Sequence, residues 1–280
     1  CLHRIGGRIT SKNIDQVACM DHWQDIVDTQ RHPIEDLDSY AVRCRSELQN
    51  NSILILENFL TKKALVELQR EARSLHHKAF YCSQNHNVLL TEKNTQWEDD
   101  HPCNIEVISD KGCVPHDLIP PESYLRKIYT AEQFQRFIQS VLTVDKVHPY
   151  ADRLSSINYN YYQEKQQLGW HFDNASFAIT LMIQSSESGG GFQFVVNARN
   201  AEKNTVDIPL IKSVLLDQSP VEELQIKEGT LILFCGRNTL HRVSPVASQT
   251  PRILATLNYN LEKDIELSEN ARLTFFGRLQ

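Results

Sequence analysis

Several features that would assign this 280-residue chain to a common functional class are absent from its sequence. No apolar run approaches the roughly 20 residues that a membrane-spanning helix needs, so no membrane association is expected. Basic residues are not in excess, because 29 Lys and Arg stand against 35 Asp and Glu. A nucleic-acid partner would require a basic face, so nucleic acid is not an expected partner.

Cysteine pairs at metal-binding spacing and phosphate-binding loops are also absent. The seven cysteines are an odd number at irregular spacings, with no C-x-x-C pair. This pattern predicts free thiols in a reducing cytoplasm and excludes a zinc-cysteine site. The glycine run at 188–191 is not followed by Lys-Ser/Thr or by a helical pattern, so it predicts a tight turn and not a phosphate loop.

The first half of the chain reads as helices around one buried strand. Residues 1–35 are polar and patternless, and we expect an N-terminal extension there, with a short helix near residues 20–29. Residues 36–280 are predicted to form a single domain, in which residues 36–150 supply helical support and a lid region. The expected elements are a helix at 36–49, a strand at 52–56, a helix capped by Thr61, a helix at 122–129 and a helix after the capping box Thr130-Ala131-Glu132-Gln133.

Residues 76–120 show no periodic pattern and contain several turn-forming residues. An irregular stretch of this length inside a domain is either functional or a surface excursion. Both interpretations stay open: a lid that selects the substrate, or a solvated loop.

Residues 151–280 have the texture of a β-rich core. Short β-branched and aromatic runs are separated by turn signals such as the one at residues 227–229. Several short strands after a helical half predict an α+β, mainly β fold: an antiparallel barrel or jelly roll backed by the N-terminal helices. The expected strands are 157–162, 178–184, 192–196, 230–234 and 253–260.

One pair of side chains in this core has metal-ligand spacing. His171 and Asp173 lie two residues apart, and residues i and i+2 of a strand project from the same face. His241 follows the apolar run 231–234 and would bring a second imidazole from a distant strand. Two histidines and one carboxylate leave open positions on a metal and are typical of non-heme Fe(II) oxygenases.

Arg252 is the expected partner of an organic cosubstrate. It stands at the start of an apolar strand, eleven residues after His241. A keto-diacid that chelates iron leaves one carboxylate at its far end, and a guanidinium matches a carboxylate in bidentate geometry. A surface arginine is the alternative.

Together these residues resemble the Fe(II)/2-oxoglutarate-dependent oxygenases related to the free-lysine halogenases and hydroxylases. The resemblance spans about residues 52–278. It implies a double-stranded β-helix (a cupin-like jelly roll), with Fe(II) held by His171, Asp173 and His241, 2-oxoglutarate held by Arg252, and O2 as second cosubstrate. The blocks that carry it are Trp170-His171-Phe172-Asp173, Gly190-Gly191-Phe192, Gly236-Arg237, Leu240-His241-Arg242-Val243, Pro245-Val246, Pro251-Arg252 and Phe276-Gly277-Arg278.

The resemblance also implies a reaction type. Halogenating members carry a small residue in place of the carboxylate, which frees a site for chloride, whereas this chain keeps Asp173. Hydroxylation of an unactivated C–H bond is therefore expected, and desaturation stays open because it needs the same iron site. The relatives suggest a free amino acid as substrate, lysine or a similar basic one. The alternatives are hydroxylation of a peptide or protein side chain or of a natural-product intermediate, and a catalytically silent cupin-like binding protein.

Strand periodicity extends the predicted pocket. Thr256 shares a face with Arg252, and Asn160 shares one with Asn158. We expect Asn158 and Trp170 to contact the cofactor, and Asn160, Thr256 and Asn174 to contact the substrate; an edge strand with a solvated face is the alternative for the two asparagines on the first core strand. The other histidines are expected at the surface, except His101. Asp99, Asp100 and Asp152 are candidate partners of a substrate amine. The sequence predicts no oligomeric state.

Overall fold

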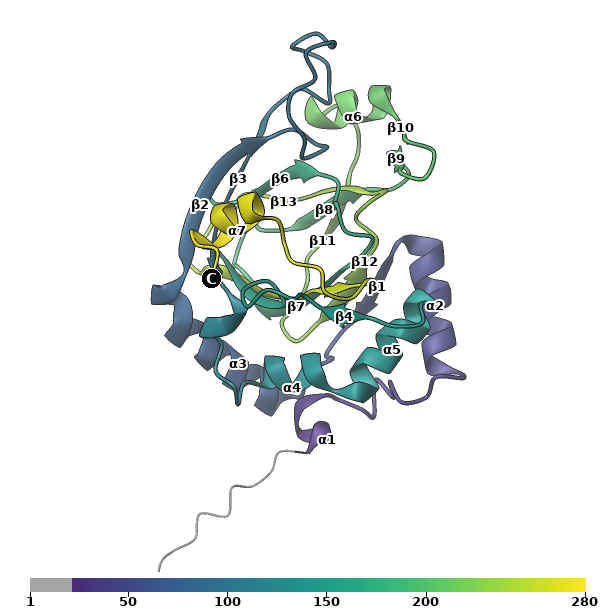
Figure 1. Ribbon diagram of the computed structural model, residues 1–280, viewed down its shortest axis with the longest axis vertical. Helices are drawn as coiled ribbons and strands as arrows, with labels where there is room; N and C mark the ends of the chain where they lie inside the picture. The colour runs from purple at the N-terminus through teal and green to yellow at the C-terminus, as the bar shows by residue number, and fades with distance from the viewer. Residues whose placement is uncertain (1–21) are drawn as a thin grey trace, which may run out of the picture.

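The larger of two facing β-sheets forms one wall of the site and carries most of the hydrophobic core. The computed structural model describes residues 22–280, and the larger sheet is antiparallel, in the order β1-β12-β7-β14-β5-β3-β2 (Figure 1). Its strands are β1 (Ile53–Leu56), β2 (Phe80–His86), β3 (Val107–Val114), β5 (Ile157–Tyr162), β7 (Ala178–Gln184), β12 (Leu231–Phe234) and β14 (Arg252–Leu257).

A smaller antiparallel sheet, β11-β8-β13-β6, faces the larger one. Aromatic side chains of β8 and β12 pack together between the sheets. Two facing antiparallel sheets form a jelly roll, so the predicted mainly-β fold is confirmed. The strands are β6 (Leu168–His171), β8 (Phe192–Val195), β11 (Glu222–Leu224) and β13 (Leu240–Val243), with two short pairs, β4 (His148–Pro149) with β15 (Tyr259–Asn260) and β9 (Arg199–Asn200) with β10 (Thr205–Val206).

Helices cover the outer faces of both sheets. The first five lie against the larger sheet, and α6 packs on the smaller one through the buried Ile211 and Val214 (Figure 1). In the described range, no helix is long and apolar enough to cross a lipid bilayer. The helices are α1 (Trp23–Ile26), α2 (Tyr40–Asn51), α3 (Lys62–Leu75), α4 (Tyr124–Thr130), α5 (Glu132–Leu142), α6 (Ile208–Leu215) and α7 (Glu269–Phe276), with 3-10 turns η1 (His76–Lys78) and η2 (His116–Leu118).

The two faces of strand β5 have different roles, because one packs on the helices and the other lines a cavity. Tyr159 and Tyr161 point into the helical layer, where their hydroxyls donate to Glu71 Oε1 and to the carbonyl of Ala72, each at 2.7 Å. Residues 158, 160 and 162 project to the opposite face and line the cavity between the sheets. The period-2 prediction for this strand is therefore confirmed, and the helices fix its position.

The folded domain begins earlier in the chain than the predicted boundary at residue 36. Ile26, Val27 and Ile34 are at most 2% exposed and belong to the main hydrophobic cluster. The hydroxyl of Thr61, which caps α3 as predicted, also donates to the carbonyl of Asp25 at 2.6 Å. Residues 22–35 are thus part of the domain. The rest of the expected extension, residues 1–21, lies outside the described residues, and so does the start of the helix expected near residues 20–29.

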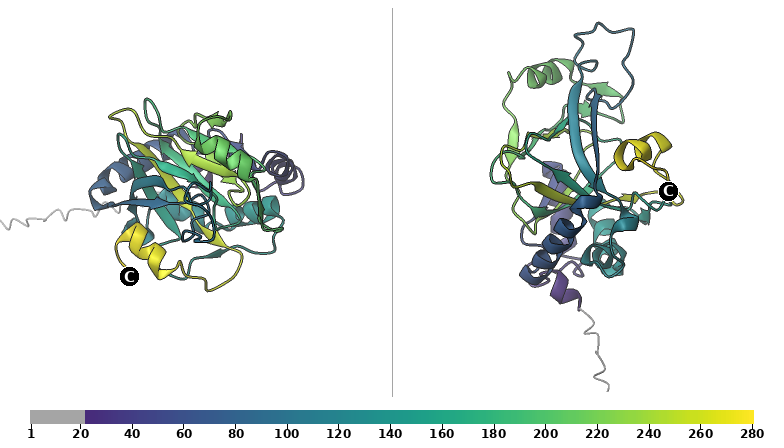
Figure 2. Two further views of the ribbon diagram at one scale, coloured as in Figure 1. Left: turned by 90° about the horizontal axis from the view of Figure 1, so that it is seen from above. Right: turned by 90° about the vertical axis from the view of Figure 1, so that its left-hand side faces the viewer.

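The region 76–120 is more regular than the sequence suggested. β2 and β3 pair from Phe80–Cys113 to His86–Val107 and extend the larger sheet as a long hairpin (Figure 2). β2 is an edge strand with a polar sequence, so it lacks the apolar alternation by which a half-buried strand is recognised. The long irregular segment is confined to residues 87–106, between the two strands, and it contributes Leu90 to the cavity wall.

The capping box predicted before α5 does not form. Thr130 belongs to the last turn of α4, where its hydroxyl donates to the carbonyl of Arg126 at 2.8 Å. Ala131 is the N-cap of α5 and offers no side-chain acceptor. The junction between the two helices is therefore one residue too short for the threonine to act as a cap.

His116 is expected to make the stability of the fold depend on pH. Burial and the adjacent Arg126 guanidinium lower the pKa of His116 from 6.5 to about 4, and Nη1 of Arg126 lies 2.6 Å from its Nε2. Between these two values the unfolded chain binds the proton more tightly, so the free energy of unfolding falls as pH falls through this window. After allowance for solvent screening, the loss should be on the order of 1–2 kcal/mol.

Urea unfolding at neutral and mildly acidic pH measures this loss. His116→Gln should flatten the pH dependence between the two conditions, and the exposed His77→Gln should leave it as in the parent chain. An unchanged slope in His116→Gln would assign the effect to other groups.

Candidate active site

Two histidines meet across neighbouring strands of the smaller sheet. His171 ends β6 and His241 lies in β13, and the two residues are directly opposite in the strand register. Their ring centroids are 4.2 Å apart. Phe234 packs edge-on against the His241 ring at 4.8 Å, so an apolar wall holds that ring in place.

Backbone carbonyls fix how the two imidazoles present their nitrogens. Nδ1 of His171 lies 2.8 Å from the carbonyl of Gly169, and Nδ1 of His241 lies 2.9 Å from that of Thr239. In each ring Nδ1–H therefore donates, which leaves the Nε2 lone pair free for a metal. Burial and the neighbouring His241 lower the pKa of His171, which favours the neutral, ligating form.

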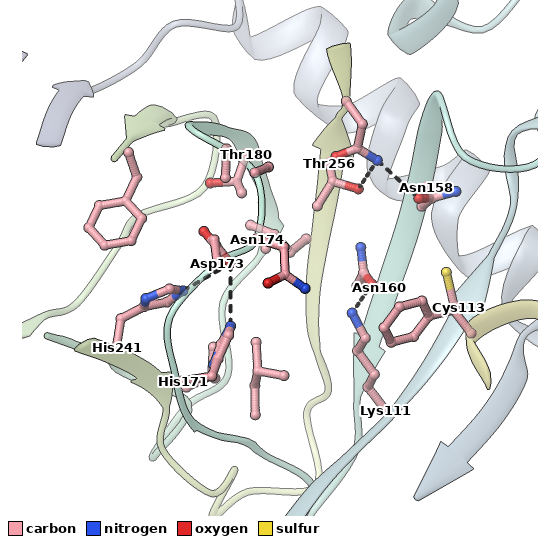
Figure 3. Close-up of a pocket in the computed structure, with 18 of the residues that line it drawn as sticks. Lys111, Cys113, Asn158, Asn160, His171, Asp173, Asn174, Thr180, His241 and Thr256 are labelled. Atoms are coloured by element: carbon pink, nitrogen blue, oxygen red, sulfur yellow. Dashed lines mark hydrogen bonds and ion pairs between the residues drawn. The ribbon is translucent and has the colours of Figure 1, made fainter. Parts of the chain in front are cut away.

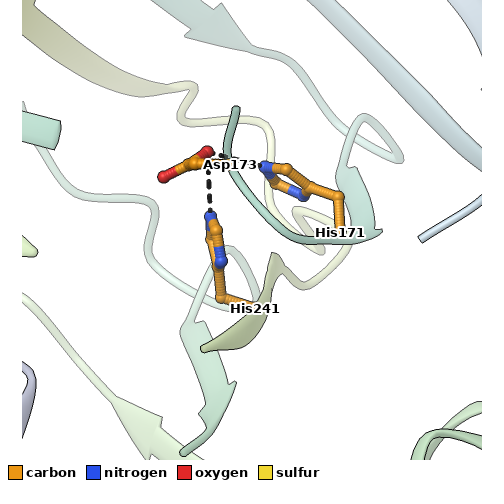
Figure 4. Close-up of side chains that lie close together, drawn as sticks. All are labelled: His171, Asp173 and His241. Atoms are coloured by element: carbon orange, nitrogen blue, oxygen red, sulfur yellow. Dashed lines mark ion pairs between the residues drawn. The ribbon is translucent and has the colours of Figure 1, made fainter. Parts of the chain in front are cut away.

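Asp173 completes the cluster from the loop after β6. Its Oδ1 lies 3.5 Å from Nε2 of His171 and 3.5 Å from Nε2 of His241 (Figure 4). Burial alone would raise the pKa of this carboxyl, but the two imidazoles outweigh it and hold the pKa well below its ordinary value. One ligand atom from each of the three residues lies within 4.8 Å of the others, so the structure brings the predicted metal ligands together.

Gly236 gives the carboxylate its room. A Cβ atom at this position would lie 1.9 Å from Oδ2 of Asp173 and 3.0 Å from Cε1 of His241. The Gly236 carbonyl also accepts the backbone N–H of Asp173 at 3.1 Å. Glycine is therefore required at position 236, because the Asp173 carboxylate approaches the backbone there too closely for any Cβ atom.

Replacing Gly236 with alanine is expected to displace Asp173 and lower Fe(II) affinity and turnover about 10- to 100-fold, as for other changes beside metal ligands. Equilibrium Fe(II) titration under argon measures the affinity. Ser176→Ala serves as control, because Ser176 is exposed in the loop that carries Asp173. This variant should behave like the parent chain. Parent-like Fe(II) affinity in Gly236→Ala would show that the carboxylate tolerates the added methyl group.

Arg252 lies buried at the far end of the cavity. It is 2% exposed, and its guanidinium carbon is 5.3 Å from the centroid of the Tyr162 ring. Two of its nitrogens, Nε and Nη1, are buried and have no hydrogen-bond partner among residues 22–280. Unpaired buried donors are costly, so this arginine is arranged for a ligand, and the carboxylate of 2-oxoglutarate fits it.

A cavity of about 390 Å³ joins the three metal ligands to Arg252. Figure 3 shows the ligands on one side and the polar residues of β5 and β14 on the other. Of the residues predicted to contact substrate, all three line this cavity. They are Asn160, Asn174 and Thr256, joined by Asn158, which was expected to contact the cofactor.

Trp170 does not line the cavity, which corrects its expected contact with the cofactor. It alternates with His171 along β6, so it points to the opposite face of the smaller sheet. There it is 3% exposed, and the guanidinium carbon of Arg242 lies 4.7 Å from its ring centroid. Trp170 therefore supports β6 from behind.

Asn158 lies away from Arg252. It pairs with Thr256 in the strand register, whereas Arg252 pairs with Tyr162, and four residues along a strand span about 13 Å. Its amide donates to the carbonyls of Leu154 and Ile157. This position groups Asn158 with the expected substrate contacts.

Lys111 and His86 line the cavity although the sequence did not indicate them. His86 was expected at the surface; instead its Nε2 lies 2.6 Å from Ser109 Oγ and its ring meets His171 edge-on. Both residues belong to the β2–β3 hairpin, which carried no strand signal. The pairing of β3 with β5 places this hairpin beside the cavity, and knowledge of that pairing would have identified both residues.

The acidic candidates for an amine partner lie elsewhere. Asp99 forms an ion pair with Lys93 at 2.7 Å in the irregular loop. Both carboxylate oxygens of Asp152 accept backbone N–H groups, among them those of Leu154 and Leu267. Asp100 is exposed, and none of the three lines the cavity.

Residues 37–274 match the family described as Halogenase D. No curated protein matches the chain. Among solved structures, a 2OG-Fe(II) oxygenase family oxidoreductase from Burkholderia pseudomallei aligns with a TM-score of 0.52 at 12% identity, covering 82% of this chain and 94% of that one.

Two further structures share the fold at similar distance. AviO1 from Streptomyces viridochromogenes Tue57 has a TM-score of 0.53 at 12% identity, with 81% of this chain and 97% of that one covered. The non-heme alpha ketoglutarate dependent carbocyclase SnoK from nogalamycin biosynthesis also has a TM-score of 0.53 at 12% identity, covering 81% and 85%. At this identity the likeness concerns the fold.

Proposed function

Because the chain belongs to the halogenase D family, and with it to the Fe(II)- and 2-oxoglutarate-dependent oxygenases, we propose that it hydroxylates an unactivated C–H bond of a free amino acid. The observation that carries the reaction type is the carboxylate of Asp173 between the two histidines. A chain that keeps this ligand has no vacant position for a halide at that point of the site.

The residues fit both expected cofactors. Fe(II) would be held by Nε2 of His171, Nε2 of His241 and the carboxylate of Asp173, and the far carboxylate of 2-oxoglutarate by Arg252. When bound, iron and 2-oxoglutarate supply the oxidation, in which O2 places one oxygen atom on the substrate and one in succinate while CO2 leaves.

The protein's own residues would position the substrate and exclude water. Leu90 from the irregular loop and Phe275 and Phe276 from α7 also line the cavity. These side chains restrict access, and the volume of about 390 Å³ suits a small molecule. Both points favour a free amino acid over a peptide or protein side chain, which would need an open groove.

A cytoplasmic location is proposed on the state of the thiols. The described cysteines, at positions 44, 82, 103, 113 and 235, are free. Free and mostly buried thiols are typical of proteins from a reducing compartment.

Aerobic incubation of the Fe(II)-loaded enzyme with 2-oxoglutarate and a pool of free amino acids tests the proposal. Mass spectrometry should find one amino acid that gains a single oxygen atom, with succinate formed in equal amount, and neither in His171→Ala. Succinate without an amino-acid product would favour a natural-product or peptide substrate. Iron binding without succinate would favour a silent binding protein.

A further inference from the structure

We infer that Lys111 binds an anionic group of the substrate, and that the substrate is a carboxylic acid without a side-chain cation, such as a neutral or acidic amino acid. The inference rests on the proposed function and narrows it. It replaces the basic amino acid that the family resemblance suggested.

Lys111 reaches into the same cavity as the metal ligands. Its Nζ donates to Oδ1 of Asn160 at 2.7 Å and lies 5.3 Å from the centroid of the Phe275 ring. Figure 3 shows Lys111 and Asn160 across the cavity from His171 and Asp173. An ammonium has three N–H donors, and among the described residues the Asn160 amide takes one of them.

Among the described residues of the cavity wall, no acidic side chain is placed to pair with Lys111. Burial and the Arg252 guanidinium act to lower the pKa of Lys111, and the neighbouring Tyr162, Cys113 and Cys82 act to raise it; the pKa ends above its ordinary value, a direction that favours the ammonium form. Among the described residues that line the cavity, Asp173 is the one acidic side chain, and it is a metal ligand.

The formal charges of the site with Fe(II) and 2-oxoglutarate bound also leave Lys111 without a counter-ion. Fe(II), the Asp173 carboxylate, the 2-oxoglutarate dianion and the Arg252 guanidinium sum to zero. Lys111 is then left as an uncompensated positive charge. A buried charge is stable when it is paired, so the substrate is the group that supplies the anion.

A basic substrate would bring a further positive charge into this cavity. Apart from Lys111, Arg252, Asp173, Cys113 and the histidines, the polar side chains that line the cavity are neutral amides and hydroxyls, and no described carboxylate other than that of Asp173 lines it. The side-chain ammonium of lysine would therefore be desolvated without a counter-ion and placed in the field of Lys111. The neutral amides and hydroxyls include Gln84, Ser155, Asn158, Asn160, Tyr162 and Thr256.

The same carboxylate chemistry could come from 2-oxoglutarate, since Lys111 is close enough to Tyr162 and Arg252 for both to act on its charge. The hydrogen bonds of the two cations separate the two sources. Arg252 keeps two unpaired nitrogens and lies over the ring of Tyr162. Nζ of Lys111 is instead turned toward Asn160, whose partner in the strand register is Leu254, two residues beyond Arg252. The arginine is thus arranged for the cosubstrate and the lysine for a second anion.

Steady-state kinetics of Lys111→Met on the Fe(II)-loaded enzyme test the assignment, with the exposed Lys146→Met as the matched control. The amino-acid pool should yield a neutral or acidic substrate. Lys111→Met should raise the KM of that substrate about 10- to 100-fold, the effect of losing one charge-assisted hydrogen bond. The KM for 2-oxoglutarate should stay within about threefold, which also shows that the variant is folded.

Three results would overturn the inference: lysine or arginine as the best substrate, an unchanged substrate KM in Lys111→Met, or a rise confined to the KM for 2-oxoglutarate. Should no amino acid turn over, the proposed function fails, and anaerobic calorimetry with the loaded enzyme still tests Lys111. Binding of glutamate or another carboxylic acid that is lost in Lys111→Met and kept in Lys146→Met supports the anion site. Equal binding by both variants contradicts it.

Discussion

Asp173→Ala is expected to lower turnover at least about 1000-fold, the largest effect of any single side chain in the site apart from the two histidines. The change removes the one anionic ligand and leaves two neutral imidazoles that face each other at 4.2 Å between ring centroids. Two neutral ligands bind Fe(II) far more weakly than two neutral ligands and a carboxylate. Iron content after dialysis and the rate of succinate formation should therefore fall together.

Asp145→Ala is the control for this prediction, because Asp145 is exposed in the turn after α5. It should retain the iron content and the turnover of the parent chain. An Asp173→Ala variant that binds Fe(II) and forms succinate at the parent rate would contradict the assignment of Asp173 as a metal ligand.

Arg252→Met is expected to raise the KM for 2-oxoglutarate about 100-fold, since it removes a buried charge-assisted pair worth about 3 kcal/mol. Methionine fills a similar volume, so the loss should concern charge and hydrogen bonding more than packing. Arg252→Lys should recover part of the affinity, because an ammonium restores the charge but not the bidentate geometry.

The initial rate of succinate formation at varied 2-oxoglutarate concentration measures this effect. Arg136→Met, at an exposed position on α5, is the control and should leave the KM unchanged. If Arg252→Met bound 2-oxoglutarate as tightly as the parent chain, the far carboxylate would have another partner, and Lys111 would be the first residue to examine.

The metal ligands could be predicted from sequence because their signal is local. His171 and Asp173 are two residues apart, at the end of β6 and in the loop that follows it, and His241 follows an apolar run that forms β12. The same period-2 rule placed Asn160 and Thr256 on the cavity face. Short-range geometry of a strand is independent of the rest of the fold, so these residues were found without knowledge of strand pairing.

Lys111 shows where that reasoning stops. β3 has no apolar alternation, and its side chains acquire a direction only when Gly112 pairs with Tyr161 of β5. Neighbours across a sheet are set by register, which a single sequence does not encode locally.

Single-turnover reaction with isotopically labelled O2 in chloride buffer tests the central claim most directly, once the amino-acid substrate is identified. The account predicts one labelled oxygen atom in succinate and one labelled hydroxyl on the substrate, with no chlorinated product. A chlorinated amino acid, or succinate whose formation leaves the substrate unlabelled, would contradict the claim that Asp173 commits this site to hydroxylation.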